Sequence, residues 1–182
     1  MSEKKKMNRE NDYQVGSGAK FTCSKFGGPS VNILAAGDDQ RNVLLWKLTD
    51  TKPKMILTGQ SSESYSLLFD DQAQNLYSGT VGGTVHVWDL NQQKEVLKMK
   101  GHATTVTCMA QSKGFHMVTG SQDTKVKLWD LRQKSNVATF REHTGAINTL
   151  GLSPDGRWVA SGSADGSLKI WDIYENRVLA NF

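Results

Sequence analysis

Tryptophan recurs at a nearly constant interval in this chain, and that spacing restricts the possible folds more than any other feature. Four tryptophans stand at positions 46, 88, 129 and 171, so they are 42, 41 and 42 residues apart. Each ends a short stretch in which apolar and polar residues alternate, as in GTVHVW and GSLKIW. Alternation with a period of two is typical of β-strands. The pattern therefore predicts an array of equivalent β units.

A second marker keeps step with the tryptophans. It is a dipeptide that carries His or a polar substitute, at Gly16-Ser17, Gly59-Gln60, Gly101-His102 and Glu142-His143. Three of the four tryptophans are followed by Asp. A period of 41 to 42 residues, with Gly-His early and Trp-Asp late, is the signature of a four-stranded propeller blade. We therefore predict an all-β chain of four four-stranded antiparallel blades, and we leave open whether four blades form a complete propeller.

The two markers also predict how the chain is divided. The propeller region covers residues 13–182, with repeats at about 16–58, 59–100, 101–141 and 142–182. Residues 1–12 are rich in charge and are expected to form a disordered tail. Propellers of this kind usually complete their last blade with an N-terminal strand, and residues 12–15 stand where that strand would be.

Composition excludes several classes of function. The net charge is +4, but about half of the excess lies in the first ten residues, so the body is nearly neutral and we expect no nucleic-acid partner. No apolar run approaches the roughly 20 residues that cross a bilayer, so we expect no membrane partner. Phosphate-loop and metal-ligand motifs are absent from the sequence, so we expect no cofactor and no metal. The two cysteines, Cys23 and Cys108, are expected to stay unpaired because a whole sheet separates them.

Repeats three and four each contain a His, a hydroxyl residue, an Asp and a Trp at matching places. These two sets are His102, Thr119, Asp123 and Trp129, and His143, Ser161, Asp165 and Trp171. A Ser-His-Asp triad would use the same residue types. A hydrolase needs one such set, however, whereas here the set recurs once per repeat. We therefore interpret both sets as structural tetrads that tie strands to a loop, and we expect no catalytic residue and no enzyme activity.

The repeats identify the chain as similar to WD-repeat propellers. Within that group, the segments 42–46, 83–90, 120–134 and 153–159 resemble, in this order, the WD-repeat regulatory subunits of katanin. The resemblance implies a non-catalytic targeting subunit, associated with microtubules and with a separate AAA ATPase that severs them. It also implies a location in the cytoplasm and on the cytoskeleton, at the centrosome or the axoneme of a cilium. The alternative is a generic protein-interaction scaffold, for example a substrate receptor of a ubiquitin ligase.

The sequence departs from the katanin pattern in two respects. The family's propeller has more blades and a helical C-terminal domain that binds the ATPase, so direct ATPase binding is not expected from these residues. The first two repeats are also degenerate: repeat two has Gln60 for His and Gly82 for Asp, and repeat one has Ala35 at the place assigned to the hydroxyl, with an extra residue after Asp39.

The resemblance also implies where partners bind. In WD propellers, exposed positions three and five residues after the His place, and just before the turn Asp, often contact partners. By this register the candidate rim residues are Lys20, Thr22, Asp38, Glu63, Tyr65, Thr105, Gln122 and Asn148. Tyr65 is the strongest candidate anchor because aromatic residues are enriched in interface hot spots. The inner strands of the end repeats show no increase in charge, so we also expect self-association through open end blades.

Overall fold

The computed structural model describes residues 19–27, 32–50, 52–112 and 116–182. Within these ranges the chain forms sixteen β-strands and no helix. The strands are β1 (Phe21–Phe26), β2 (Ile33–Asp38), β3 (Val43–Lys47), β4 (Met55–Leu57), β5 (Ser64–Phe69), β6 (Asn75–Thr80), β7 (Thr84–Asp89), β8 (Lys94–Lys100), β9 (Val106–Gln111), β10 (His116–Ser121), β11 (Val126–Asp130), β12 (Ser135–Phe140), β13 (Ile147–Leu152), β14 (Trp158–Ser163), β15 (Leu168–Asp172) and β16 (Arg177–Asn181).

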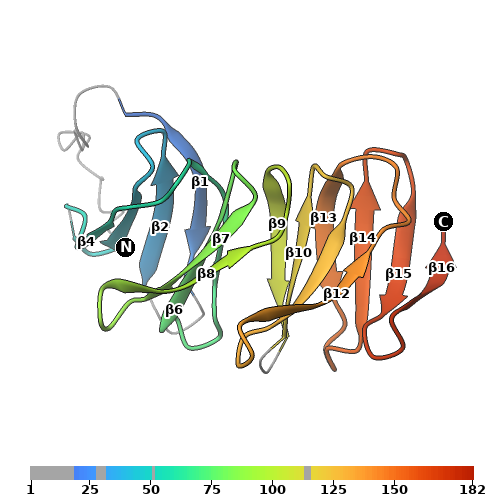
Figure 1. Ribbon diagram of the computed structural model, residues 1–182. Coiled ribbons are helices and arrows are strands. Elements are labelled where there is room, and N and C mark those ends of the chain that lie inside the picture. Colours follow the sequence, from blue (N-terminus) through green and yellow to red (C-terminus); the bar gives the residue numbers. More distant parts are fainter. Residues whose placement is uncertain (1–18, 28–31, 51, 113–115) are drawn as a thin grey trace, which may run out of the picture.

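The strands form four separate four-stranded sheets, each made of four consecutive strands in antiparallel order (Figure 1). We number the sheets from one (β1–β4) to four (β13–β16). This arrangement confirms the predicted all-β fold of four antiparallel blades. The expected disordered tail at residues 1–12 and the expected closing strand at residues 12–15 both lie outside the described residues.

Equivalent turns explain why the four sheets have the same shape. The turn between the second and third strand of every sheet contains a residue with positive φ, at Arg41, Gly83, Thr124 and Gly166. The first strand of every sheet, which we call its inner strand, also carries a β-bulge near its start. A bulge bends and twists the strand locally. Matching turns and bulges therefore define which residues are equivalent from one sheet to the next.

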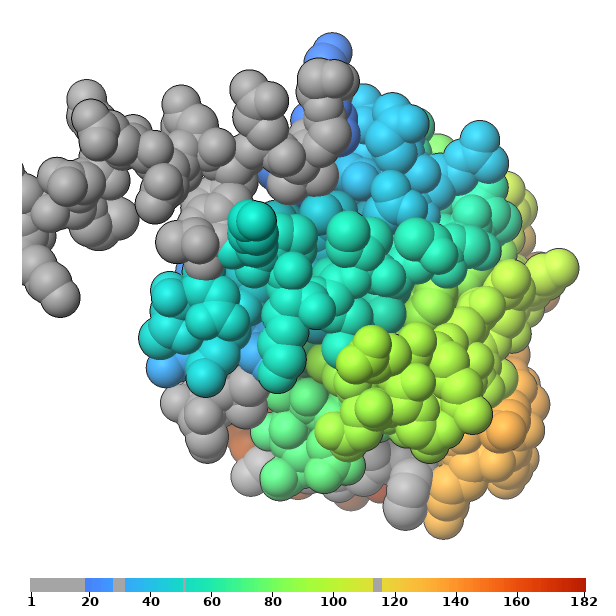
Figure 2. Space-filling model, turned by 90° about the vertical axis from the view of Figure 1, so that its left-hand side faces the viewer, coloured from blue at the N-terminus to red at the C-terminus, as the bar shows by residue number. Residues whose placement is uncertain are grey.

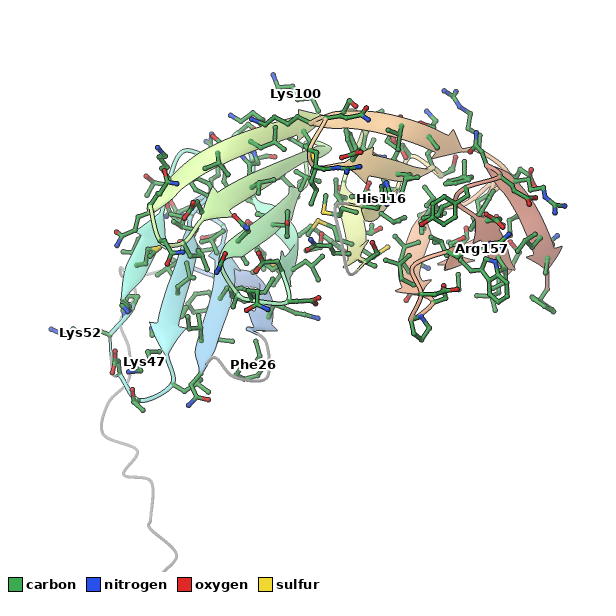
Figure 3. All side chains as sticks on the ribbon, turned by 90° about the horizontal axis from the view of Figure 1, so that it is seen from below. Phe26, Lys47, Lys52, Lys100, His116 and Arg157 are labelled. Atoms are coloured by element: carbon green, nitrogen blue, oxygen red, sulfur yellow. The ribbon has the colours of Figure 1, made fainter. Side chains whose placement is uncertain are left out.

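The hydrophobic core is divided into three layers that lie between neighbouring sheets. One apolar cluster joins sheets one and two, a second joins sheets two and three, and a third joins sheets three and four. The inner strands β1, β5, β9 and β13 contact one another in that order. Figure 3 shows that the sheets follow an arc that does not close, with Lys47 at one end and Arg157 toward the other. Stability therefore comes from contacts between nearest-neighbour sheets.

Candidate functional site

A buried chain of hydrogen bonds connects the four tetrad residues of sheet three. His102 lies before β9, Asp123 lies in the β10–β11 turn, and Thr119 and Trp129 lie on β10 and β11. His102 Nδ1 is 2.9 Å from Asp123 Oδ2, and His102 Nε2 is 2.7 Å from Thr119 Oγ1. Trp129 Nε1 donates to the same hydroxyl at 2.9 Å. An imidazole that donates from Nδ1 and accepts at Nε2 satisfies every member of the chain.

The environment of this tetrad keeps the imidazole neutral and the carboxyl ionised. Burial lowers the pKa of His102, and the nearby Asp123 only partly opposes that effect. Burial alone would raise the pKa of Asp123, but the backbone N–H of Ala103 and the His102 side chain outweigh it and lower the pKa. Ala103 N donates to Asp123 Oδ2 at 2.9 Å. The carboxylate therefore holds both the imidazole and the loop that carries it.

Sheet four repeats the same arrangement. His143 Nδ1 lies 3.0 Å from Asp165 Oδ2, and His143 Nε2 lies 2.8 Å from Ser161 Oγ. Trp171 Nε1 donates to Ser161 Oγ at 2.7 Å. Ser167 donates to Asp165 Oδ1 at 2.6 Å and is the main cause of the lowered pKa of that carboxyl.

The hydroxyls of both tetrads are poor candidates for nucleophiles. Thr119 and Ser161 are both 0% exposed, so a substrate has no access to either hydroxyl. Each hydroxyl also accepts the indole N–H of its tryptophan. A nucleophile needs a free approach to the reacting carbon and an adjacent base. The arrangement instead connects a loop, a turn and two strands within each sheet.

Sheet two contains a different polar cluster at the same place. Gln60 Oε1 accepts from Ser64 Oγ at 3.0 Å and from Ser78 Oγ at 2.9 Å. Ser78 stands at the hydroxyl position, yet Trp88 Nε1 is buried without a hydrogen-bond partner, as is Gln60 Nε2. Sheet two, which has Gln60 in place of His, therefore lacks the continuous chain of hydrogen bonds seen in sheets three and four.

His86 is a buried residue that the sequence did not single out. Its side chain is 0% exposed, and its Nδ1 lies 2.6 Å from Glu95 Oε1. The ring stacks on Trp88 with centroids 6.3 Å apart and an interplanar angle of 14°. The alternation of β7 contains the relevant signal, because residues two apart share a face of the strand. His86 and Glu95 therefore add a second buried polar group to sheet two, beside the Gln60 cluster.

The register of sheet one corrects one sequence assignment. Leu34 pairs with Trp46 and Ala36 with Leu44, whereas in sheet three Met117 and Thr119 take these two places. Ala36, not Ala35, therefore stands at the hydroxyl position. The assignment was wrong because it counted from Asp39. The shared positive φ of Arg41 and Thr124 shows that Gln40, not Asp39, is the equivalent of Asp123.

Six of the eight candidate rim residues are exposed, namely Lys20, Thr22, Glu63, Tyr65, Gln122 and Asn148. The other two, Asp38 and Thr105, were expected to be exposed and are 2% and 6% exposed, so neither can be part of an open rim. Asp38 turns inward because its carboxylate accepts the backbone N–H groups of Gln40 and Asn42 at 3.0 and 2.8 Å. Thr105 is covered because its hydroxyl donates to Val81 O of the preceding sheet at 3.4 Å.

Three of the exposed candidates occupy one equivalent place on the inner strands. Thr22 lies on β1, Tyr65 on β5 and Asn148 on β13, each one residue after the start of the bulged segment. The Thr22 hydroxyl donates to Ser64 O of the next sheet at 2.6 Å. Tyr65 is 49% exposed. The inner strands therefore present a row of side chains of which Tyr65 is the largest.

Three further findings concern metal ligation, membrane spanning and the cysteines of the described part of the chain. Among those residues, no group of three or more His, Cys, Asp or Glu side chains is placed to hold a metal ion. No helix there is long and apolar enough to cross a membrane. Cys23 and Cys108 are unpaired, and burial raises the pKa of the Cys108 thiol to about 11.

Comparison with known families gives three matches to the WD domain, G-beta repeat, at residues 51–89, 93–130 and 134–172. Each match begins with the outer strand of one sheet (β4, β8 or β12) and ends with the third strand of the next. The family repeat is therefore offset by one strand from the sheet. Together the matches cover more than half of the chain.

Individual relatives share part of this region. The chain is 33% identical over 138 residues to the anaphase-promoting complex subunit cdh1 of Dictyostelium discoideum, which covers 73% of this chain and 18% of that protein. It is 34% identical over 88 residues to Coronin-7 of Mus musculus, covering 44% of this chain and 9% of the relative. It is 27% identical over 132 residues to the transcription factor unc-37 of Caenorhabditis elegans, covering 72% and 21%. The chain thus spans less than a quarter of the length of these relatives, and by its repeats it belongs to the WD-repeat family.

Proposed function

We propose that this chain is a targeting adaptor that holds a protein partner against the exposed side chains of its inner strands and rim. WD-repeat domains mediate protein–protein contacts and typically have no catalytic role. The observation that carries the proposal is the half-exposed side chain of Tyr65. Its strand, β5, packs against β1 of sheet one and β9 of sheet three, so its backbone is held on both sides. Interface hot spots are often aromatic side chains surrounded by other contacts that exclude water.

The surface around Tyr65 has the mixed character of an interface centre and rim. Glu63 and Gln122 are exposed at neighbouring loop positions of sheets two and three. Their backbones are held by hydrogen bonds between loops, since Val81 N donates to Glu63 O at 3.0 Å and Gln122 N donates to Thr105 O at 3.0 Å. The polar side chains are therefore presented from ordered backbone, which lowers the entropy lost on binding.

The specific partner that we propose is the microtubule, in the manner of katanin's WD-repeat regulatory subunit. The support is the similarity of the four repeat segments, in order, to that subunit. Under this proposal the chain works in the cytoplasm on the cytoskeleton, at the centrosome or axoneme, and directs a separate AAA ATPase. The chain's own role under this proposal is to bind the microtubule, since direct binding of the ATPase is not expected from these residues.

Co-sedimentation with polymerised tubulin tests this proposal. The wild-type chain should sediment with the polymer, and a Tyr65→Ala, Gln122→Ala variant should bind roughly tenfold more weakly, because it loses the aromatic anchor. A Val137→Ala variant is the matched control, since Val137 is 46% exposed on the outer strand β12, away from the rim. Absence of wild-type sedimentation would refute the microtubule partner, and equal binding by the double variant would refute the rim.

A second candidate is a substrate receptor of a ubiquitin ligase. It is favoured by the 73% of this chain that aligns with a subunit of the anaphase-promoting complex. Purified anaphase-promoting complex should then bind the immobilised chain, and polymerised tubulin should not. The two candidates are separated by running both binding assays on the same preparation.

A further inference from the structure

Among the described residues, the two end sheets of the arc each have one face with no sheet packed on it, whereas sheets two and three pack against a sheet on both faces. Figure 3 shows the open arc, and Figure 2 views the molecule from the end formed by sheet one. The three contacts inside the array use one repeated set of positions. The equivalent positions on the two open faces therefore indicate what those faces can contact.

The first repeated feature is a side chain that sits on a glycine of the preceding sheet. These side chains start the inner strands, at Ser64, Val106 and Ile147, and all three are 0% exposed. A Cβ added to the facing glycine would lie 2.6 Å from Ser64, 2.8 Å from Val106 or 2.6 Å from Ile147, at Gly37, Gly79 and Gly120 respectively. Only glycine leaves room for such a close approach between sheets.

The second repeated feature is an apolar row on each contacting face. On the face toward the next sheet, the row is Val43, Leu45 and Leu57 in sheet one, Val85, Val87 and Met99 in sheet two, and Val126, Leu128 and Phe140 in sheet three. All nine side chains are at most 5% exposed. On the face toward the preceding sheet, the buried tryptophans Trp88, Trp129 and Trp171 receive these rows.

The open face of sheet four carries the same features without a neighbour. By the shared pairing register, its row is Leu168, Ile170 and Phe182. Leu168 is 42% exposed and Phe182 is 75% exposed. Gly162 stands at the glycine position, where an added Cβ would meet only Thr149 of its own sheet. We call Gly162, Leu168, Ile170 and Phe182 the leading face.

The open face of sheet one carries the complementary features. Phe21 stands at the place of Ser64, Val106 and Ile147, and it is 52% exposed rather than buried. Its ring meets Trp46 edge-on, with centroids 5.8 Å apart. Phe21, Leu34 and Trp46 line one groove on this face. We call these three residues the trailing face.

We propose that the leading face of one copy binds the trailing face of a second copy, so that two chains close one ring. The proposed contact continues the three contacts already present in the chain: Phe21 would cover Gly162, and the row of Leu168 and Phe182 would pack on Trp46. Both faces belong to the same chain, so a second copy supplies both complements at once. Two such contacts related by a two-fold axis close a ring of eight sheets, within the range of about four to eight blades known for propellers.

The mass of the 182-residue chain in solution tests this proposal. Size-exclusion chromatography with light scattering should give twice the chain mass of 20.1 kDa. A Leu168→Glu or a Phe21→Glu variant should elute at the mass of one chain at the same concentration. Val96→Glu is the matched control, because Val96 is 40% exposed on β8 and lies on neither end face. A single-chain mass for the wild type, or an open series of oligomers, would overturn the proposal.

Mixing the two end variants distinguishes this contact from other modes of association. The Leu168→Glu chain keeps an intact trailing face, and the Phe21→Glu chain keeps an intact leading face. An equimolar mixture should therefore recover a two-chain species that neither variant forms alone. Circular dichroism melts of each variant verify folding before mixing. Failure of the folded variants to associate when mixed would overturn the head-to-tail arrangement even if the wild type is a dimer.

Discussion

Replacing Thr119 by Val tests the structural role of the tetrad in sheet three. Valine keeps the shape of threonine but removes the hydroxyl. His102 Nε2 and Trp129 Nε1, which lie 2.7 and 2.9 Å from that hydroxyl, would both lose their partner inside the protein. Each unsatisfied buried polar group costs about 1–3 kcal/mol, so the free energy of unfolding should fall by about 2–6 kcal/mol. For a chain of this length the melting temperature should fall by roughly 4 °C or more.

Thermal unfolding followed by circular dichroism measures this effect. Thr58→Val is the matched control, because Thr58 is exposed and the same chemical change there should alter stability by less than about 0.5 kcal/mol. A double-mutant cycle with Trp129→Phe then isolates the hydrogen bond. The two changes together should cost less than the sum of their separate effects, because either one alone breaks the same bond. Equal melting temperatures for Thr119→Val and Thr58→Val would refute the structural role that we assign to the tetrad.

Three further predictions concern other buried polar groups. Asp165→Ala should lower the melting temperature, because the Asp165 carboxylate accepts hydrogen bonds from the His143 imidazole and from the backbone N–H of Thr144. Gly82→Asp should bring no matching gain, because sheet two lacks the histidine. An unchanged melting temperature of the Asp165→Ala variant would contradict this role. Burial lowers the pKa values of His86 and His102 below the ordinary value of about 6.5. Below about pH 6.5 these two histidines therefore bind more protons in the unfolded chain than in the folded one. The free energy of unfolding should fall as the pH drops from about 6.5. Denaturant titrations at pH 7.5 and 5.5 measure this, and a higher midpoint at pH 5.5 would disprove it. The Cys108 thiol should react with iodoacetamide at pH 8 much more slowly in the folded than in the denatured protein, since burial raises its pKa to about 11; equal rates would count against the burial.

The sequence alone determined the repeating unit and the members of the tetrads. The fixed interval between tryptophans, together with alternation before each of them, is enough to define a four-stranded unit, because strand length and turn chemistry are local properties. The His, hydroxyl, Asp and Trp positions follow from the same interval. The structure joins these side chains by hydrogen bonds in sheets three and four.

Register and burial at individual positions needed the tertiary structure. A count from Asp39 placed the hydroxyl equivalent of sheet one at Ala35, whereas strand pairing places it at Ala36. Asp38 and Thr105 read as exposed loop residues, yet each is covered because its side chain bonds to backbone groups of a turn or of a neighbouring sheet. A polar residue in a loop carries no local signal of which way its side chain points.

The contrast is sharpest at the ends of the arc. Val126 and Leu168 are equivalent apolar residues in equivalent strands, and the sequence gives no reason to treat them differently. Val126 is 0% exposed and Leu168 is 42% exposed, because within the described part of the chain only Val126 has another sheet packed on it. Local sequence can encode a strand and its turns, but burial depends on which surface lies opposite. Only the tertiary structure decides that, since each sheet buries its faces on its neighbours and not within itself.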